Sequence, residues 1–267
     1  MGFSFDPGVI LAIALSLGLY ARAVRVLGRR GFEVPGVQQT AWYAGIALVA
    51  VGLVSPIDGL GEDLLSLHMA QHLLIADLAA PLILAGIRTP VLVFLLPRPV
   101  LVPLARMHRL RALFRFVRRP LVAIPIWVVT LYGWHLGFMF EGALTSSFVH
   151  ALQHASFVVA SLLVWWSAIE PKRGRMPGEL WKAGSIVGAR AAGMFLGVAF
   201  IAMRSQAYDP YGNAAFDYGL TPLQDQQIAG GMMLTIDMLV MLSAFAFFFW
   251  RAAQEHDRAE RAAAATG

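Results

Sequence analysis

Long apolar runs alternate with short polar stretches along almost the whole chain. Seven of these runs have roughly 17 to 25 residues, enough for an α-helix to cross a hydrocarbon core of about 30 Å at about 1.5 Å per residue. The pattern predicts an all-α, polytopic integral membrane protein with a bundle of seven transmembrane helices. The predicted spans are 8–27, 39–56, 63–87, 120–140, 146–169, 181–204 and 227–251.

An eighth apolar run, at 91–104, is shorter and is interrupted by three prolines. Proline lacks a backbone N–H and opposes a continuous helix. This run is therefore predicted to be an interfacial or re-entrant piece that leads into the basic stretch 106–119. The predicted organisation is one transmembrane domain over 1–251, with the interfacial segment at about 90–119, and a cytoplasmic tail over 252–267.

The composition supports membrane insertion and narrows the chemistry. Hydrophobic residues make up 58% of the 267 residues and charged residues only 14%. The mean hydropathy is +0.65, outside the range of an ordinary soluble domain. The chain contains no cysteine. Disulfides and thiolate metal sites are therefore excluded, and any soft-metal chemistry must depend on Met and His.

The basic residues lie almost entirely on one side of the predicted membrane. Nineteen of the 21 Lys and Arg residues lie in the regions after the first, third, fifth and seventh runs, and the two exceptions are Arg190 and Arg204. Cytoplasmic loops of membrane proteins carry this excess, so we expect an external N-terminus and a cytoplasmic C-terminus. This distribution explains the net charge of +5, and no nucleic-acid partner is expected.

Five histidines fall in the outer layer of the predicted membrane. His68 and His72 lie in the outer half of the third run, His135 near the outer end of the fourth, and His150 and His154 in the first turns of the fifth. Residues at i and i+4 share a helix face, so each pair presents two imidazoles to one point. Polar groups without partners are costly at this depth and usually face a cavity or a ligand. We therefore expect a metal or haem site.

Two methionines belong to the same predicted site. Met69 adjoins the first histidine pair, and Met233 lies at the start of the seventh run in the same layer. Imidazole and thioether ligands without thiolate favour copper over a structural zinc ion. The stretch "HMAQH" at 68–72 also lacks the glutamate base of a zinc protease. The alternatives at this point are hydrogen-bonded packing of the histidine pairs and gap filling by the methionines.

Polar residues near the start of the seventh run are candidates for orienting the ligands. The stretch "TPLQDQQ" predicts a helix start with Thr221 as N-cap and Gln224 at the third position. Metal-bound imidazoles usually donate their second ring nitrogen to a carboxylate, a carbonyl or water. Asp225, Gln226 and the deeper Asp237 are therefore expected to support the ligand histidines.

One further carboxylate, Asp77, lies at mid-membrane depth in the third run, too far along the helix for the N-terminal dipole to stabilise it. Arg190 in the sixth run lies at a comparable depth and is the expected partner. A structural ion pair is favoured over a role in proton or ion movement.

Four parts of the chain carry a resemblance to a known family. They are "SPIDGLGEDLLSLHMAQHLLI" with the later "APLILAG", "GWH" at 133–135, "HALQHASFVVASLLVWW" at 150–166, and "YDPYG" with "LTPLQDQQIAGGMM" before the seventh run. With these stretches, the chain resembles the bacterial, polytopic membrane type of cytochrome c oxidase assembly factor usually called CtaG. The positions that match the family are His68, His72, His135, His150, His154 and Met233.

The resemblance implies a metallochaperone of the respiratory chain and not an enzyme. The implied function is assembly of a haem-copper oxidase in the bacterial inner (plasma) membrane, through copper supply from a site on the periplasmic side. The implied partners are membrane lipid, cytochrome c oxidase subunits and periplasmic copper chaperones.

Two other functions stay open. A membrane cytochrome would use two of the five histidines, from different helices, as axial haem ligands. A metal-free scaffold would hold an oxidase subunit during assembly. A conventional transporter is less favoured, because the sequence shows no obvious inverted repeat or broken helix pair.

Overall fold

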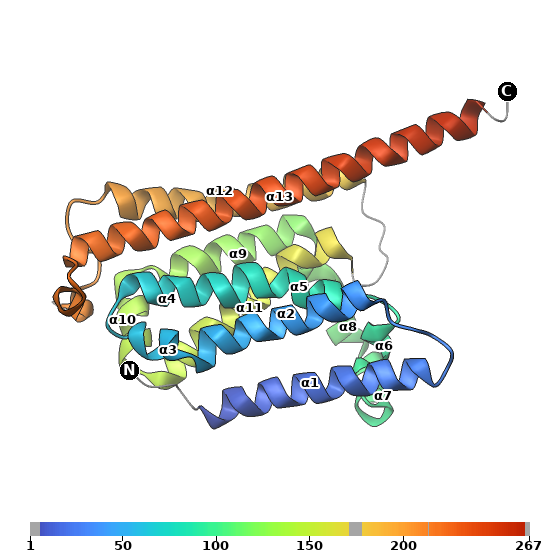
Figure 1. Cartoon of the computed structure of the whole chain (residues 1–267), viewed down its shortest axis with the longest axis horizontal. Helices are drawn as coiled ribbons and strands as arrows, with labels where there is room; N and C mark the ends of the chain where they lie inside the picture. The colour runs from blue at the N-terminus through green and yellow to red at the C-terminus, as the bar shows by residue number, and fades with distance from the viewer. Residues whose placement is uncertain (1–5, 171–177, 213, 265–267) are drawn as a thin grey trace.

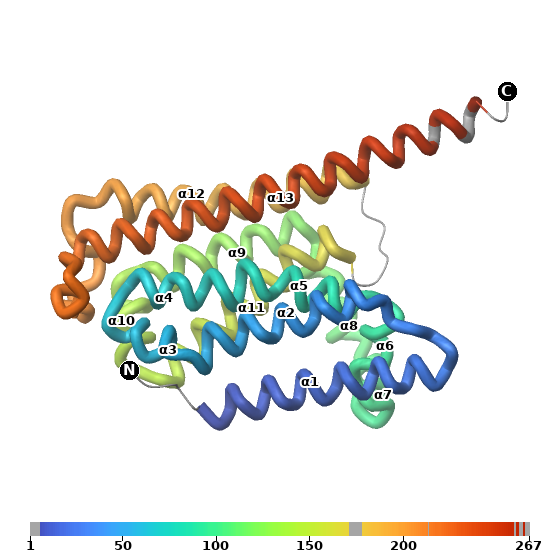
Figure 2. The backbone as a smooth tube through the Cα atoms, in the orientation of Figure 1, coloured from blue at the N-terminus to red at the C-terminus, as the bar shows by residue number. Residues whose placement is uncertain are grey.

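The computed structural model describes residues 6–170, 178–212 and 214–264. Within these ranges every regular element is a helix and no strand is present, which confirms the all-α prediction. The long helices lie along one axis, with α1 (Pro7–Gly28) on one flank and α13 (Pro222–Ala264) on the other (Figure 1). The tube view follows the same elongated bundle, with the last turns of α13 projecting beyond it (Figure 2).

Six helices of the described chain are long and apolar enough to cross a membrane, and a bent pair makes seven if it counts as one span. These helices coincide with the apolar runs of the sequence. Besides α1 and α13, the unbroken ones are α2 (Gly36–Val54), α11 (Ser147–Ile169) and α12 (Glu179–Ala202).

The connections form short helices. They are α3 (Pro56–Leu60), α6 (Val91–Leu95), α7 (Arg98–Arg106), α8 (His108–Val117), and the 3₁₀ turns η2 (Asp209–Tyr211) and η3 (Ala214–Tyr218). The Pro-rich run and the basic stretch after it thus become α6, α7 and α8, and no residue of α7 or α8 is buried. At the other end of the bundle, η2 and η3 belong to the loop between α12 and α13 (Figure 1).

The third span is the most buried of the six and changes its winding halfway. It consists of α4 (Leu65–His72), a π-helical turn η1 (Leu73–Leu78) and α5 (Ala79–Gly86). Pro81 has no N–H to donate to the carbonyl of Asp77 four residues earlier, which weakens the α-helical pattern at this point. Such π-helical turns occur frequently at functional sites. Here the turn follows the histidines of α4 directly.

The fourth predicted span is not one helix over 120–140. It breaks at His135 into α9 (Pro120–Trp134) and α10 (Gly137–Thr145), with a bend of 72°. A glycine lies two residues to either side of His135, and glycine is a poor helix former. The break was not visible in the sequence, because hydropathy gives the length of an apolar run and not a bend within it.

Small residues let α12 and α13 pack closely. A Cβ added to Gly197 would lie 2.8 Å from the carbonyl oxygen of Gly230, and one added to Gly230 would lie 2.6 Å from the carbonyl oxygen of Gly197. Backbones come this close only where side chains are absent. As a result, Met233 and Asp237 of α13 lie directly against α12.

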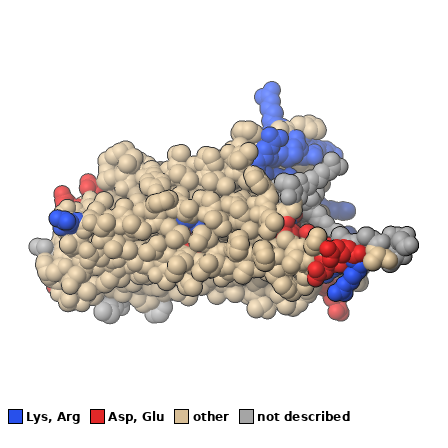
Figure 3. All heavy atoms as spheres, turned by 90° about the horizontal axis from the view of Figure 1, so that it is seen from above, with Lys and Arg blue, Asp and Glu red and all other residues tan. Residues whose placement is uncertain are grey.

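Charged side chains gather at the two ends of the bundle, and the flank between them is almost free of charge on the face shown in Figure 3. Most of the visible Lys and Arg side chains lie at the end where α13 finishes. This division agrees with the charge bias of the sequence. Which end faces the cytoplasm stays a prediction.

Candidate metal centre

Four imidazoles from α4 and α11 form one packed group. The ring centroids of His68 and His72 lie 4.6 Å apart and those of His150 and His154 lie 4.2 Å apart. Between the helices, His68 lies 5.2 Å from His150, and His72 lies 5.0 Å from His154. The i, i+4 spacing in both helices thus places each ring beside at least two of the others.

His135 approaches the group from the break between α9 and α10. Its Nδ1 lies 2.7 Å from the carbonyl oxygen of Leu131, and as the donor in this bond it leaves a lone pair on Nε2. His135 and His72 line a small cavity of about 20 Å³ together with Met69 and Met233. A cavity of this size holds about one water molecule. The other lining residues are Leu73, Ala76, Asp77, Trp127, Leu131 and Phe157.

Six buried ring nitrogens of these five histidines have no hydrogen-bond partner within the described chain. They are Nε2 of His68, both nitrogens of His72, and Nε2 of His135, His150 and His154. An unsatisfied buried polar group costs on the order of 1–3 kcal/mol, and native proteins contain few of them. Six such atoms in one layer indicate a site for a ligand.

The donor set fits a soft metal ion, but the rings do not already surround one point. Imidazole and thioether groups are suitable ligands for copper, above all Cu(I). Among the His, Asp and Glu residues that the structure describes, no three side chains are arranged to hold a metal ion. The rings instead pack against one another, without the hydrogen bonds that the packing alternative assumed for the histidine pairs. Coordination therefore requires some rings to rotate about their side-chain torsions.

An aromatic roof covers the outer side of the imidazoles; it consists of Phe140, Tyr208 and Tyr211. Phe140 and Tyr208 stack with centroids 3.9 Å apart, and the Phe140 centroid lies 5.1 Å from that of His68. The Tyr208 hydroxyl donates to the His135 carbonyl oxygen at 2.9 Å, and Tyr211 donates to a carbonyl after α3 at 3.3 Å. Burial raises the pKa of both tyrosine hydroxyls, so both remain neutral donors at physiological pH.

His150 is the least buried of the five histidines and lies beside an acidic edge. The carboxylates of Asp58 and Glu62 are close enough to interact with it electrostatically. Gln71 of α4 holds Asp58 in place by donating to its Oδ1 at 2.5 Å. Acidic edges attract cations, so His150 is the first ring that a metal ion from this end would meet.

Asp225 and Gln226 bind backbone groups instead of imidazoles. Asp225 accepts from the N–H groups of Leu65 at 2.7 Å and Ser66 at 3.2 Å. It thereby caps α4, whose own N-cap residue makes no side-chain hydrogen bond. Gln226 accepts from the N–H of Ala207 at 2.6 Å. Their support of the histidines is therefore indirect: Asp225 fixes the helix that carries His68 and His72, and Gln226 fixes the loop that carries the roof.

The predicted capping box at the start of α13 is present. The Thr221 N–H donates to Gln224 Oε1 at 2.8 Å, and the Gln224 N–H donates to Thr221 Oγ1 at 3.2 Å. These reciprocal bonds fix the first turn of α13. That turn carries Asp225, so the box also supports the cap on α4.

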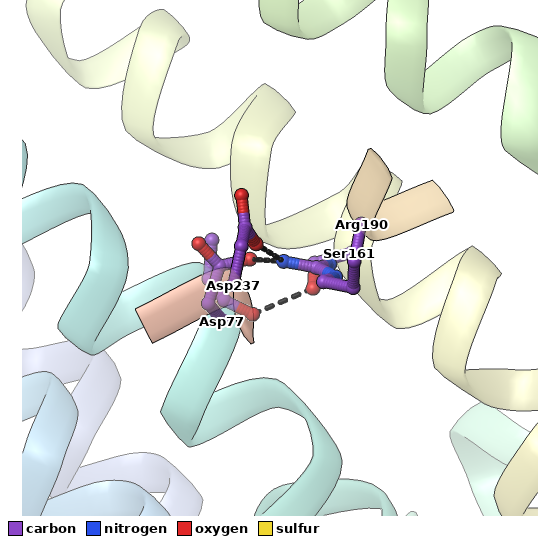
Figure 4. A network of polar contacts seen from close by, with 5 residues as sticks. Asp77, Ser161, Arg190 and Asp237 are labelled. Atoms are coloured by element: carbon purple, nitrogen blue, oxygen red, sulfur yellow. Dashed lines mark hydrogen bonds and ion pairs between the residues drawn. The ribbon is translucent and has the colours of Figure 1, made fainter. Parts of the chain in front are cut away.

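Asp237 belongs to a buried charge cluster with Asp77 and Arg190. Arg190 of α12 uses one nitrogen, Nη1, for both carboxylates, and this atom lies 3.1 Å from Asp237 Oδ1 (Figure 4). The ion pair between Asp77 and Arg190 expected from their depth is confirmed. Asp237, expected to support a histidine, instead binds this arginine. Gly193 of α12 makes the contact possible, because an added Cβ would overlap the Asp237 carboxylate.

Two parts of the site were not predicted from the sequence. Gln153 of α11 is fully buried, and its amide lies close enough to His68 to interact with it, although the contact does not have hydrogen-bond geometry. Its position between His150 and His154 was a usable signal, since an amide at that depth needs a partner. The aromatic roof had no such signal, because Tyr208 and Tyr211 lie in an irregular loop without periodicity.

Together, the fold and the site define a multi-pass helical membrane protein with a buried layer of histidines and methionines near one end of its bundle. The family model for the cytochrome c oxidase caa3 assembly factor (Caa3_CtaG) matches residues 18–255. The chain therefore belongs to this family of oxidase assembly factors, and the resemblance found in the sequence is confirmed. No curated protein and no solved structure matches the chain significantly.

Proposed function

We propose that this assembly factor binds copper in its layer of histidines and methionines and supplies it to a subunit of the oxidase. The observation that carries the proposal is the set of six buried ring nitrogens without partners beside a cavity lined by Met69 and Met233. Copper is the cargo here and not a resident cofactor. The site faces the periplasmic side of the bacterial plasma membrane in this proposal, as the positive-inside rule predicts.

The imidazole rings form a series of neighbouring binding positions that leads inward from the acidic edge of Asp58 and Glu62. His150 receives the ion, and the rings of His154 and His68 lie next, with centroids 4.2 Å and 5.2 Å from that of His150. His72 follows, 5.0 Å from His154 and 4.6 Å from His68. Each ring can therefore take over the ion while the previous one still binds it.

The path ends at the small cavity, where His72, His135, Met69 and Met233 hold the ion. All four ligands are neutral, and Met side chains are flexible and adapt their shape. Exchange of a thioether against an incoming ligand of the receiving subunit therefore costs little rearrangement. A site of this kind suits transfer better than permanent storage.

The alternative of a haem-binding cytochrome has less support. The cavity between His72 and His135 measures about 20 Å³, far less than a porphyrin occupies. In addition, the imidazoles pack against one another, whereas bis-histidine ligation places two rings on opposite faces of one iron. A Soret band that survives copper chelation in the purified protein would nevertheless establish the haem alternative.

Metal analysis of the purified protein tests the proposal. His72→Phe replaces the imidazole with a somewhat larger apolar ring and removes two nitrogens from the cavity. We expect the variant to retain less than a tenth of the copper of the wild type after expression in copper-replete cells. The matched control is His108→Phe in α8, an exposed position, which should keep full copper content.

Oxidase activity in cells distinguishes copper supply from a scaffold function. If His72→Phe lowers both the copper content and the assembled oxidase, copper supply is supported. If the copper content falls but oxidase activity is unchanged, assembly does not need the bound copper and the proposal of copper supply is wrong. Equal copper content in wild type and variant would also overturn it.

A further inference from the structure

The cluster of Asp77, Arg190 and Asp237 has two carboxyl groups for one guanidinium. Arg190 is 0% exposed, Asp77 6% and Asp237 4%. With both carboxyl groups ionised the cluster has a formal charge of −1, and with a proton on one of them it is neutral. The neighbouring Ser161 is neutral and donates to the Ala76 carbonyl oxygen at 2.5 Å (Figure 4). A net charge buried at membrane depth is costly unless an opposite charge lies near it.

The nearest basic groups do not supply that opposite charge. Asp77 borders a groove of about 930 Å³ that Lys182 and Arg251 also line. Lys182, however, lies 2.9 Å from carboxylate oxygens of both Glu170 and Glu179, and Arg251 also pairs with Glu179 at 3.6 Å. These charges are balanced among themselves. Arg88 also lines the groove, but it is exposed and lies about 16 Å from Asp77 along the third span, at about 1.5 Å per residue.

One member of the cluster, Asp77, also lines the histidine and methionine cavity. Asp77 lines this cavity together with His72 and Met233, while its carboxylate binds Arg190. The Arg190 guanidinium lies over the Trp127 ring, 4.8 Å from its centroid, and Trp127 lines the cavity as well. The excess negative charge therefore lies next to the space proposed for the metal ion.

The ligands of the cavity contribute no charge of their own, because neutral imidazoles and thioethers bind through lone pairs. The charge of a bound ion must then be balanced by the neighbouring cluster of Asp77, Arg190 and Asp237. A monovalent cation brings the cavity and the cluster to a total charge of zero, whereas a divalent cation leaves +1. In a medium of low dielectric constant the neutral total is the less costly one.

We propose that the Asp77–Arg190–Asp237 cluster is the counter-charge for one monovalent cation in the cavity, and that the site therefore binds copper as Cu(I). This inference rests on the proposed copper function and names the charge state of the cargo. The thioether groups of Met69 and Met233 favour the same oxidation state for an independent reason, their softness. Asp237 acts through its charge alone, since it does not line the cavity.

Asp237→Asn tests the charge without touching the cavity wall. Asparagine has the same shape and still accepts a hydrogen bond from Arg190 Nη1. Ag(I) is a redox-inert monovalent probe, and its affinity can be measured in detergent by competition with a chelator. A unit charge about 10 Å away at an effective dielectric constant of about 20 changes the affinity on the order of tenfold, so we expect Ag(I) to bind about tenfold more weakly. Asp257→Asn, on the exposed end of the same helix, should leave the affinity unchanged.

Asp77→Asn completes the test. If both Asn variants weaken Ag(I) binding by similar factors, the counter-charge is supported. If Asp237→Asn has no effect and Asp77→Asn abolishes binding, Asp77 is a direct ligand and the charge-balance inference is wrong. Thermal unfolding of each variant without metal shows whether it is folded. If one of the two variants does not fold, the Ag(I) affinity of the other variant decides the test.

The two proposals fail in different ways. A wild-type protein that binds neither Ag(I) nor Cu(I) would refute the copper function itself. A wild type that binds both, with an affinity that Asp237→Asn does not change, would leave the copper function standing and refute only the counter-charge.

Discussion

Two polar regions lie inside this helical bundle, and they satisfy their polar groups differently. In the charge cluster, Arg190 is held by Asp77 and Asp237 from two other helices. In the histidine layer, six ring nitrogens have no partner within the described chain. Burial alone therefore does not distinguish a structural group from a ligand-binding one. The difference lies in the ion pairs: the protein supplies two carboxylates for Arg190 Nη1, although Arg190 Nε and Nη2 have no hydrogen-bond partner in the described chain, and it supplies no partner for the six ring nitrogens.

The two regions also depend on different elements. The charge cluster joins η1, α12 and α13 at mid-bundle, and its close packing depends on Gly193. The histidine layer is positioned by groups that never touch an imidazole, chiefly Asp225 at the start of α4. Substitutions in the cluster should therefore affect stability first, and those in the layer should affect metal binding first.

The largest loss of stability is expected for Arg190→Met. The substitution leaves two buried carboxylates without their cation, and breaking a buried pair in this way costs about 3–5 kcal/mol. The free energy of unfolding in detergent measures the effect. Arg204→Met is the control, because Arg204 is exposed at the end of α12. A loss of unfolding free energy below about 1 kcal/mol would show that the charge cluster is no more important for stability than the histidine layer.

An intermediate effect is expected for Asp225→Ala. The variant removes the cap from two N–H groups at the start of α4, and the loss of a helix cap costs about 0.5–2 kcal/mol. Because α4 carries His68 and His72, the Ag(I) affinity should fall as well. Asp217→Ala, at an exposed position in the loop between α12 and α13, should change neither. Loss of stability with unchanged Ag(I) affinity would show that the cap does not position the histidines.

Much of this fold could be predicted from the sequence, because lipid imposes a simple rule on it. A helix that crosses a membrane must be apolar over most of its length, so the spans are visible as runs. The common layer of His68, His72, His150 and His154 followed from their depth and their i, i+4 spacing. The pair of Asp77 with Arg190 followed from depth alone.

The remaining features depend on contacts that depth does not fix. Hydropathy gives the position of Asp237 along its helix but not the rotation that turns it toward Arg190 and away from the histidines. The bend at His135 arises from local backbone preferences inside an apolar run. The aromatic roof depends on the path of an irregular loop, and such a path leaves no periodic pattern in the sequence.

The smallest effect on stability, and the clearest contrast with Arg190, is expected for His72→Phe in metal-free protein. Both ring nitrogens of His72 lack partners, so their removal breaks no hydrogen bond. The larger phenyl ring can extend into the adjoining cavity of about 20 Å³, so stability should change by less than about 1 kcal/mol. Ag(I) should then stabilise the wild type by about 2.7 kcal/mol at 100 times its Kd and the variant hardly at all. If metal-free His72→Phe were instead as unstable as Arg190→Met, the imidazoles would be structural groups like the charge cluster, and the distinction between the two regions would be lost.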